Sequence, residues 1–378
     1  MADVWRWLPQ LIAESLEFYT DIRSAPGGEW RDSLKDATQF LTLAHTLRTT
    51  GAEAMIQAVR ANALGEWLVP EWPNATVSVT TAAAAATSLP VAVPAAYSVG
   101  QEVFIGLDAD RWEKRTVSAV GGSSVTISAG LGQTYVGTKG RPLIVAPLIL
   151  CIAPGGIEFQ STFDVKGLTA RFMSIEPVDL AANPYPLHDG IPVVTDGVVP
   201  FTPLAGSLNQ SSDLMASGFG AYELQEVESF TRRRGTLSWY DKTPAKRWER
   251  RGFMHFLRGQ DGEFWLPSGQ NDLPLQASVS SGALAITVRP ATTDAEMAGR
   301  VIVIREGASI VTREVVAALT TGDEQDLEIA APGVAFTAAA QVSLAHRSRL
   351  EVDTVEINYQ WVGAGLAAFC TAPTIEVP

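Results

Sequence analysis

Apolar and polar side chains alternate strictly near the end of the chain, from Val355 to Trp361. Every second position is apolar, and Glu, Asn and Gln stand between the apolar residues. Successive side chains of a strand point to opposite faces, so this pattern predicts a strand with one buried and one wet face. Residues 157–163 show a similar alternation and predict a second strand of this kind.

The two alternating segments belong to a longer internal repeat. Residues 65–70, GEWLVP, match residues 262–267, GEFWLP, at an offset of 197 positions. The other matches follow in the same order, at offsets between 192 and 199: 12–22 with 204–214, 114–120 with 313–319, and 156–168 with 354–366. A nearly constant offset is typical of a tandem duplication, and it predicts two like halves.

One helix is predicted in each half, just before the aromatic segment that ends in proline. In the first half, Thr50 and Glu53 form a capping-box pattern. In the second half, Thr243 precedes Pro244, which is typical of an N-cap residue followed by proline at the first helical position. The stretch from the threonine to the next aromatic segment is four residues longer in the second half, so we expect that helix to be about one turn longer.

Short apolar segments separated by turn residues predict a small β-barrel or sandwich inserted in each half. The alanine-rich stretch 80–98 contains Pro90 and Pro94, which favour extended structure over a short alanine helix. The predicted strands are 40–47, 101–106, 114–120 and 124–130 in the first half, and 235–241, 300–306, 313–319 and 325–331 in the second.

These elements define two domains. The first covers residues 1–176 with a β-rich insert at about 74–142, and the second covers 200–378 with an insert at about 271–345. Residues 177–199 link them. This linker is rich in Pro, Asp and Gly, but Val, Ile and Leu are spread through it, so we expect an extended and ordered connection. The fold class is therefore mainly β (α+β).

The charge of the chain bears on its partners. The 378 residues carry a net charge of −13, which argues against a general nucleic-acid-binding surface. The N-terminal stretch lacks the basic and continuous apolar regions of a signal peptide. The longest apolar run, residues 143–153, is interrupted by Pro147 and is too short to cross a bilayer. We expect a soluble protein, made in the cytoplasm, with no membrane insertion.

The residues that usually carry chemistry are scattered. The four histidines, His45, His188, His255 and His346, have no metal-ligand spacing, and no phosphate loop, nucleophile elbow or dinucleotide fingerprint is present. Cys151 and Cys370 make neither a metal pattern nor a disulfide framework, so we expect buried thiols. The sequence therefore predicts no catalytic residue, no cofactor and no metal site.

Two basic clusters stand out in this acidic chain. Such clusters can be subunit contacts, solvated faces or phosphate-binding groups, and a subunit contact is favoured because basic faces pair with acidic neighbours across interfaces. Trp5 and Trp7 join them, since burial at an interface or in a core is commoner for tryptophan than stacking on sugars. The candidate subunit-interface residues are Arg232, Arg233, Arg234, Lys246, Arg247, Arg250, Arg251, Trp5 and Trp7.

The order of a strand, one amphipathic helix, an aromatic strand ending in proline and a long alternating strand resembles the tail-tube fold of long-tailed bacteriophages. Residues 14–22, with Glu14, Leu16, Tyr19 and the segment Thr20-Asp21-Ile22, resemble the start of siphophage tail-tip proteins, whereas residues 28–31 depart from that pattern. Residues 232–267 resemble distal-tail segments. The resemblance implies two tandem tail-tube-like β-sandwich domains, each with one flanking helix.

The resemblance also implies a function and partners. The chain would be a structural component of the virion tail tip or baseplate, either the distal tail ring or the adjoining hub. It would form a homo-oligomeric ring that joins the tail tube to the hub, contacts the tape-measure protein, and lets DNA pass without specific binding. A trimer with pseudo-six-fold symmetry is preferred over a hexamer, because two like domains in each of three chains make six positions.

Two other classes were weighed. A receptor- or carbohydrate-binding adhesin would retain exposed aromatic residues in both inserts, yet Trp112 has no aromatic counterpart in the second insert. A hydrolase would cluster His, Cys or acidic residues, which the sequence does not do. The structural role is therefore the favoured hypothesis.

Overall fold

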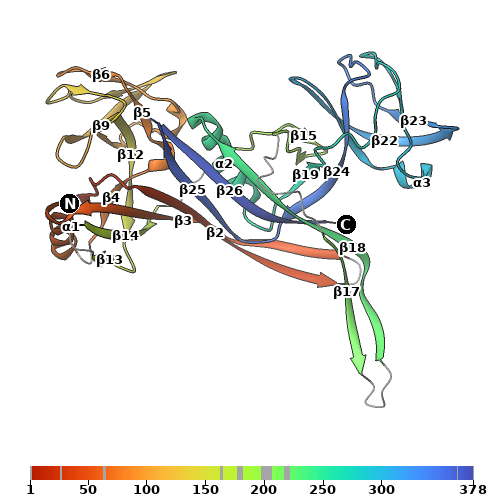
Figure 1. The fold of residues 1–378 in the computed structure, drawn as a ribbon, viewed down its shortest axis with the longest axis horizontal. Helices are drawn as coiled ribbons and strands as arrows, with labels where there is room; N and C mark the ends of the chain where they lie inside the picture. The colour runs from red at the N-terminus through yellow and green to blue at the C-terminus, as the bar shows by residue number, and fades with distance from the viewer. Residues whose placement is uncertain are drawn as a thin grey trace.

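The computed structural model describes residues 2–25, 28–62, 65–161, 165–176, 182–196, 207–216, 222–363 and 365–377. The protein is mainly β, as the sequence predicts. Long antiparallel strands cross the centre of the molecule, and two small β units lie at opposite ends of its long axis (Figure 1). The hairpin of β17 (Ser207–Ala216) and β18 (Tyr222–Asp241) projects away from this body (Figure 1).

The first half is built on a long hairpin. Strand β2 pairs with β3, β3 with β14, and β14 with both β13 and β12, while β12 also pairs with β4. Helix α1 follows β3 directly. The bounds are β2 (Leu11–Ala25), β3 (Gly28–Arg48), α1 (Thr49–Ala61), β4 (Trp67–Pro70), β12 (Leu143–Ile152), β13 (Ile157–Ser161) and β14 (Val165–Ser174), and the short β1 (Asp3–Val4) pairs with β4 in parallel.

The second half repeats this order of pairings. Strand β17 pairs with β18, β18 with β26, and β26 with both β25 and β24, while β24 also pairs with β19. Helix α2 follows β18, as α1 follows β3. The bounds are α2 (Pro244–Leu257), β19 (Glu263–Pro267), β24 (Gln341–Leu350), β25 (Thr354–Val362) and β26 (Gly365–Glu376).

Each small β unit pairs its strands in one order too. In the first, β7, β10, β9, β8 and β12 are successive neighbours; in the second, the neighbours are β20, β23, β22, β21 and β24. Each has its own cluster of buried apolar residues, within 82–145 and 273–342. In the first unit the bounds are β7 (Ser88–Pro90), β8 (Glu102–Gly106), β9 (Trp112–Val120) and β10 (Ser124–Ile127), and in the second they are β20 (Ala285–Val288), β21 (Val301–Glu306), β22 (Ser309–Thr321) and β23 (Glu324–Ile329). The first half also contains β5 (Thr76–Ser78), β6 (Thr81–Ala82), β11 (Tyr135–Val136) and the 3-10 helices η1 (Trp72–Asn74) and η2 (Pro94–Ala96). The second half contains the short helix α3 (Asp294–Met297).

The two halves do not form separate sandwiches with separate cores. Strand β2 of the first half pairs with β25 of the second, from Leu11 opposite Gln360 to Glu17 opposite Thr354. One large buried cluster then takes residues from both halves, among them Leu16 and Ile357. The sequence analysis missed this shared core, because alternation shows that a strand has a buried face but not which strand lies beside it.

The two helices begin in different ways. Thr243 is the N-cap of α2, and its hydroxyl oxygen accepts a hydrogen bond from the Lys246 backbone N–H at 3.3 Å, as predicted. The capping box predicted at Thr50 is wrong, because α1 begins at Thr49 and Glu53 pairs with Lys166 instead. The additional turn is also wrong: α1 has 13 residues and α2 has 14.

Residues 80–98 and the described part of the linker are largely extended, as the sequence predicts. Within 80–98 the chain is extended at β6 and β7, with a 3-10 turn at Pro94–Ala96 and no α-helix. Residues 182–196 of the linker are described, and they form the short strands β15 (Leu187–His188) and β16 (Ile191–Pro192). Tyr185, Val193 and Val194 are buried there, so this part of the linker packs against the body.

Candidate functional site

The two halves meet where β2 pairs with β25, and we call this contact the joint. A cluster of buried polar side chains lies at its centre. Glu14 lies on the inward face of β2, between the buried side chains of Ile12 and Leu16, and is itself fully buried. Its carboxylate accepts hydrogen bonds from Gln39 Nε2 at 2.7 Å and from the Tyr359 hydroxyl at 2.6 Å. Burying a carboxylate costs free energy unless its charge is paired, so a cationic side chain is expected next to Glu14.

Arg251 of α2 is that cation. Its guanidinium is fully buried and lies 2.8 Å from a Glu14 oxygen and 2.7 Å from a Glu71 oxygen. Its Nη1 also donates to the side-chain oxygen of Asn74 at 2.9 Å. Burial acts to lower the pKa of Arg251, but the carboxylates of Glu14 and Glu71 outweigh it and raise the pKa, so the side chain stays charged. This network ties α2 to the first half.

Two other arginines of α2 are buried beside it. Arg250 pairs with Asp196 at 3.0 Å and Asp241 at 3.2 Å, and its guanidinium lies 4.4 Å from the centre of the Trp239 ring. Arg247 donates to the backbone oxygen of Leu366 at 2.5 Å. The side chains of Arg247, Arg250 and Arg251 are therefore all interior.

The prediction that Arg247, Arg250 and Arg251 form a subunit interface is therefore corrected. Arg250 and Arg251 do pair with acidic neighbours, but those neighbours are Glu14, Glu71, Asp196 and Asp241 of the same chain. Arg247 instead donates to the backbone oxygens of Pro73 and Leu366. Arg232 is also buried. The sequence alone does not reveal this pairing, because Glu14, Glu71 and Asp196 lie far from α2 along the chain.

Trp5 and Trp7 need the same correction. Both are buried, and the Trp5 ring packs edge-on against Trp67 at 5.4 Å and Phe172 at 4.8 Å between ring centres. The Trp5 indole N–H donates to His45 Nε2 at 3.2 Å. Burial lowers the pKa of His45 to about 4, so its imidazole is neutral at pH 7 and can accept this bond.

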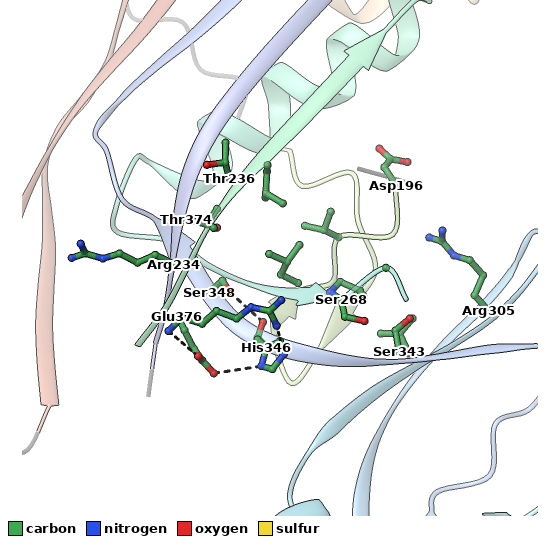
Figure 2. Close-up of a pocket in the computed structure, with 18 of the residues that line it drawn as sticks. Asp196, Arg234, Thr236, Ser268, Arg305, Ser343, His346, Ser348, Thr374 and Glu376 are labelled. Atoms are coloured by element: carbon green, nitrogen blue, oxygen red, sulfur yellow. Dashed lines mark hydrogen bonds and ion pairs between the residues drawn. The ribbon is translucent and has the colours of Figure 1, made fainter. Parts of the chain in front are cut away.

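Arg233, Arg234 and Lys246 keep exposed side chains, so they alone among the nine candidates remain available to a partner. Arg233 and Arg234 line a pocket of about 350 Å³ between the central strands and the second small β unit, with His346, Glu376 and Arg305 (Figure 2). Arg233 contacts His346 Nε2 at 3.0 Å, and His346 Nδ1 lies 3.4 Å from Glu376.

The pocket offers no prepared site for an anion. Arg234 pairs with Glu351 at 3.3 Å, and Arg305 donates to the backbone oxygen of Thr195. Lys246 likewise contacts Glu249 at 2.7 Å. Each of these cations already has a partner in the chain, so a ligand would have to displace it.

Two strand edges were missed by the sequence analysis. Strand β13 pairs with β14 on one side, and the pairings of the described residues place no strand on its other side. The same holds for β17, which pairs with β18 alone within the described part of the chain. Phe159, in the middle of β13, is 62% exposed. These edges lie at opposite ends of the central strands (Figure 1).

The residues that the structure describes include both cysteines and all four histidines. They contain no group of three or more His, Cys, Asp or Glu side chains placed to hold a metal ion. Cys151 and Cys370 are free and buried, and burial raises the pKa of Cys370 to about 12, which keeps it in the unreactive thiol form. None of the described helices is both long enough and apolar enough to cross a membrane.

No protein-family model matches the chain, and no curated protein matches it.

Proposed function

We propose that this chain is a structural component of the tail tip of a long-tailed bacteriophage, in which two tail-tube-like units per chain form part of a ring around the DNA channel. The observation that carries the proposal is the joint: two halves with the same strand pairings meet edge to edge through β2 and β25. An edge-to-edge joint can be repeated by further copies, and a repeated head-to-tail joint forms a ring where the rotation between copies closes.

The edge-to-edge arrangement favours three chains over six. A six-chain ring would need the second unit to stack beside or below the first, whereas β2 and β25 lie in one continuous sheet. Three chains with two units each supply six positions. Such a ring would connect the tail tube to the hub. The net charge of −13 suits a channel through which DNA slides without sticking.

The adhesin alternative gains no support from Trp112. This side chain is half-buried and stacks on Phe104, with ring centres 5.8 Å apart and planes inclined by 9°. A ring engaged in this way is not presented for a sugar.

The test is the mass and symmetry of the assembly. The full-length chain, purified or within tail tips, should form closed rings, with three copies by native mass spectrometry and three-fold symmetry in particle images. Six copies in a closed ring would keep the tail-tip function but reject the three-chain arrangement. A monomer within the mature particle, or an open filament, would refute the proposal.

A further inference from the structure

We infer that β13 of one copy pairs with β17 of a second copy, antiparallel and in the register that places Ile157 opposite Leu208. This inference rests on the proposed ring and names the surface that closes it. The partner is a second copy of this chain.

The first step is that β13 and β17 occupy the places that β25 and β2 hold in the joint. Strand β2 opens a long hairpin whose second strand runs directly into α1, and β17 opens the hairpin whose second strand leads into α2. Strands β13 and β25 each form a hairpin with the last strand of their half, β14 or β26. Within the chain, the edge of β2 pairs with the edge of β25. The corresponding edges, those of β17 and β13, have no strand beside them among the described residues.

The second step is the register. Within the joint, Leu16 of β2 lies opposite Val355 of β25. Leu16 lies opposite Gln39 in the first hairpin, and Leu208 lies opposite Arg233 in the second. The repeat relates residues 12–22 to 204–214 and 156–168 to 354–366, which makes Leu208 the counterpart of Leu16 and Ile157 the counterpart of Val355. Transferring the joint places Leu208 opposite Ile157.

The third step is burial. In β25, which has β2 on one side and β26 on the other, Val355 and Ile357 are each 1% exposed. Phe159, the counterpart of Ile357, is 62% exposed in β13. The two strands carry the same alternation, so the difference comes from their surroundings. Ile157 is partly buried against the core, and the exposed Phe159 is accounted for if β13 also receives a neighbour.

The fourth step is that β13 carries few of the features that keep strand edges apart, with Glu158 as its one charged residue. Its sequence, Ile157-Glu158-Phe159-Gln160-Ser161, holds neither proline nor lysine, and its pairing with β14 shows no bulge. Natural edge strands normally carry such features to prevent pairing with other chains. An edge with an exposed phenylalanine, no proline and no bulge fits strand addition.

The joint between copies differs in chemistry from the joint within the chain. The internal joint is held by Arg251 of α2 against Glu14 and Glu71. Helix α1 occupies the matching place in the first half, and its only charged residues are Glu53 and Arg60. It has no arginine at the positions that α2 uses, so the second joint cannot reproduce the network. The two joints would alternate around the ring, and each would select its own partner.

The experiment is a cysteine cross-link in the full-length chain. Directly opposed residues of an antiparallel pair lie about 4.5–5.5 Å apart between Cα atoms, which suits a disulfide. The double variant Ile157→Cys with Leu208→Cys, oxidised in the assembled ring, should give covalent dimers and trimers on a non-reducing gel. The matched control, Glu158→Cys with Leu208→Cys, is one residue out of register and should cross-link at least tenfold less. The native cysteines are buried and should stay silent.

A second variant tests the apolar contact. Phe159→Asp alters a side chain that is exposed in the single chain, so the chain should fold with unchanged thermal stability and yet fail to form rings. A ring that persists in Phe159→Asp, or that does not cross-link through Ile157→Cys and Leu208→Cys, would overturn this joint and leave the proposed function standing. Absence of any ring from the unaltered chain and from the particle would overturn both.

Discussion

At the scale of the residue, the polar groups of the core are held by partners that are distant in sequence. His45 lies in strand β3, yet its ring nitrogens contact the Trp5 indole at 3.2 Å and the Leu8 backbone oxygen at 3.1 Å. Glu14 and Arg251 are 237 residues apart. Such groups are neutral or paired because the fold buries them, and loss of a partner would leave a buried polar group unsatisfied.

His45 predicts a pH dependence of stability. Its pKa is about 4 in the folded chain and 6.5 in the unfolded chain, so below pH 6.5 the unfolded state binds the proton more readily. Stability should be fully present above pH 6.5 and decline as the pH falls toward 4, by about 3 kcal/mol in total from this group.

The measurement is urea unfolding at pH 7 and at pH 4.5, compared between the unaltered chain and His45→Gln. Carboxylates titrate in both proteins, so the difference between them isolates the histidine. The unaltered chain should lose more stability on acidification than the variant does. Equal losses would show that His45 does not titrate with a lowered pKa.

At the scale of the element, the same helix occurs twice with different starts. Thr243 caps α2 through its side chain, whereas α1 begins after Arg48 with no side-chain cap. The sequence predicts a threonine cap at the start of both helices. Thr50 is not the N-cap because β3 ends at Arg48 and α1 begins at Thr49, so Thr50 already lies inside the helix.

This difference predicts that replacing the threonine by alanine lowers stability at the start of α2 but not at the start of α1. Thr243→Ala removes the acceptor for the Lys246 N–H and should reduce the free energy of unfolding by about 1 kcal/mol. Thr50→Ala, at an exposed position inside α1, should leave stability unchanged or raise it by up to about 0.5 kcal/mol, since alanine is the better helix former. Denaturant midpoints of the two variants check this. A loss at Thr50 as large as that at Thr243 would contradict the helix starts described above.

At the scale of the whole molecule, the two halves are held together by a sheet and by one buried charge network. Strands β2 and β25 supply backbone hydrogen bonds and a shared apolar core. Arg251 adds contacts to Glu14, Glu71 and Asn74 of the first half. Removing one partner of a buried ion pair leaves the others uncompensated, which costs about 3–5 kcal/mol.

Arg251→Met should therefore lower the free energy of unfolding by about 3–5 kcal/mol. Combining it with Glu14→Gln and Glu71→Gln should recover part of the loss, because the stranded carboxylates are then neutral. The control is Arg234→Met, whose half-exposed ion pair with Glu351 should be worth less than about 1 kcal/mol. Calorimetric and denaturant unfolding measure all three. An Arg251→Met variant as stable as the control would show that the network does not hold the halves together.

The amino-acid pattern determined the strands of the inserts, the proline ends of β4 and β19, the cap of α2 and the repeated order of elements, because these depend on local periodicity and on backbone chemistry. Tertiary structure alone decided which strand lies beside which. Ile157–Ser161 and Thr354–Val362 alternate alike, yet only the second is covered, because β2 pairs with it. It also decided that Arg247, Arg250 and Arg251 are interior, since a charge can be buried only where distant carboxylates and carbonyl oxygens converge on it.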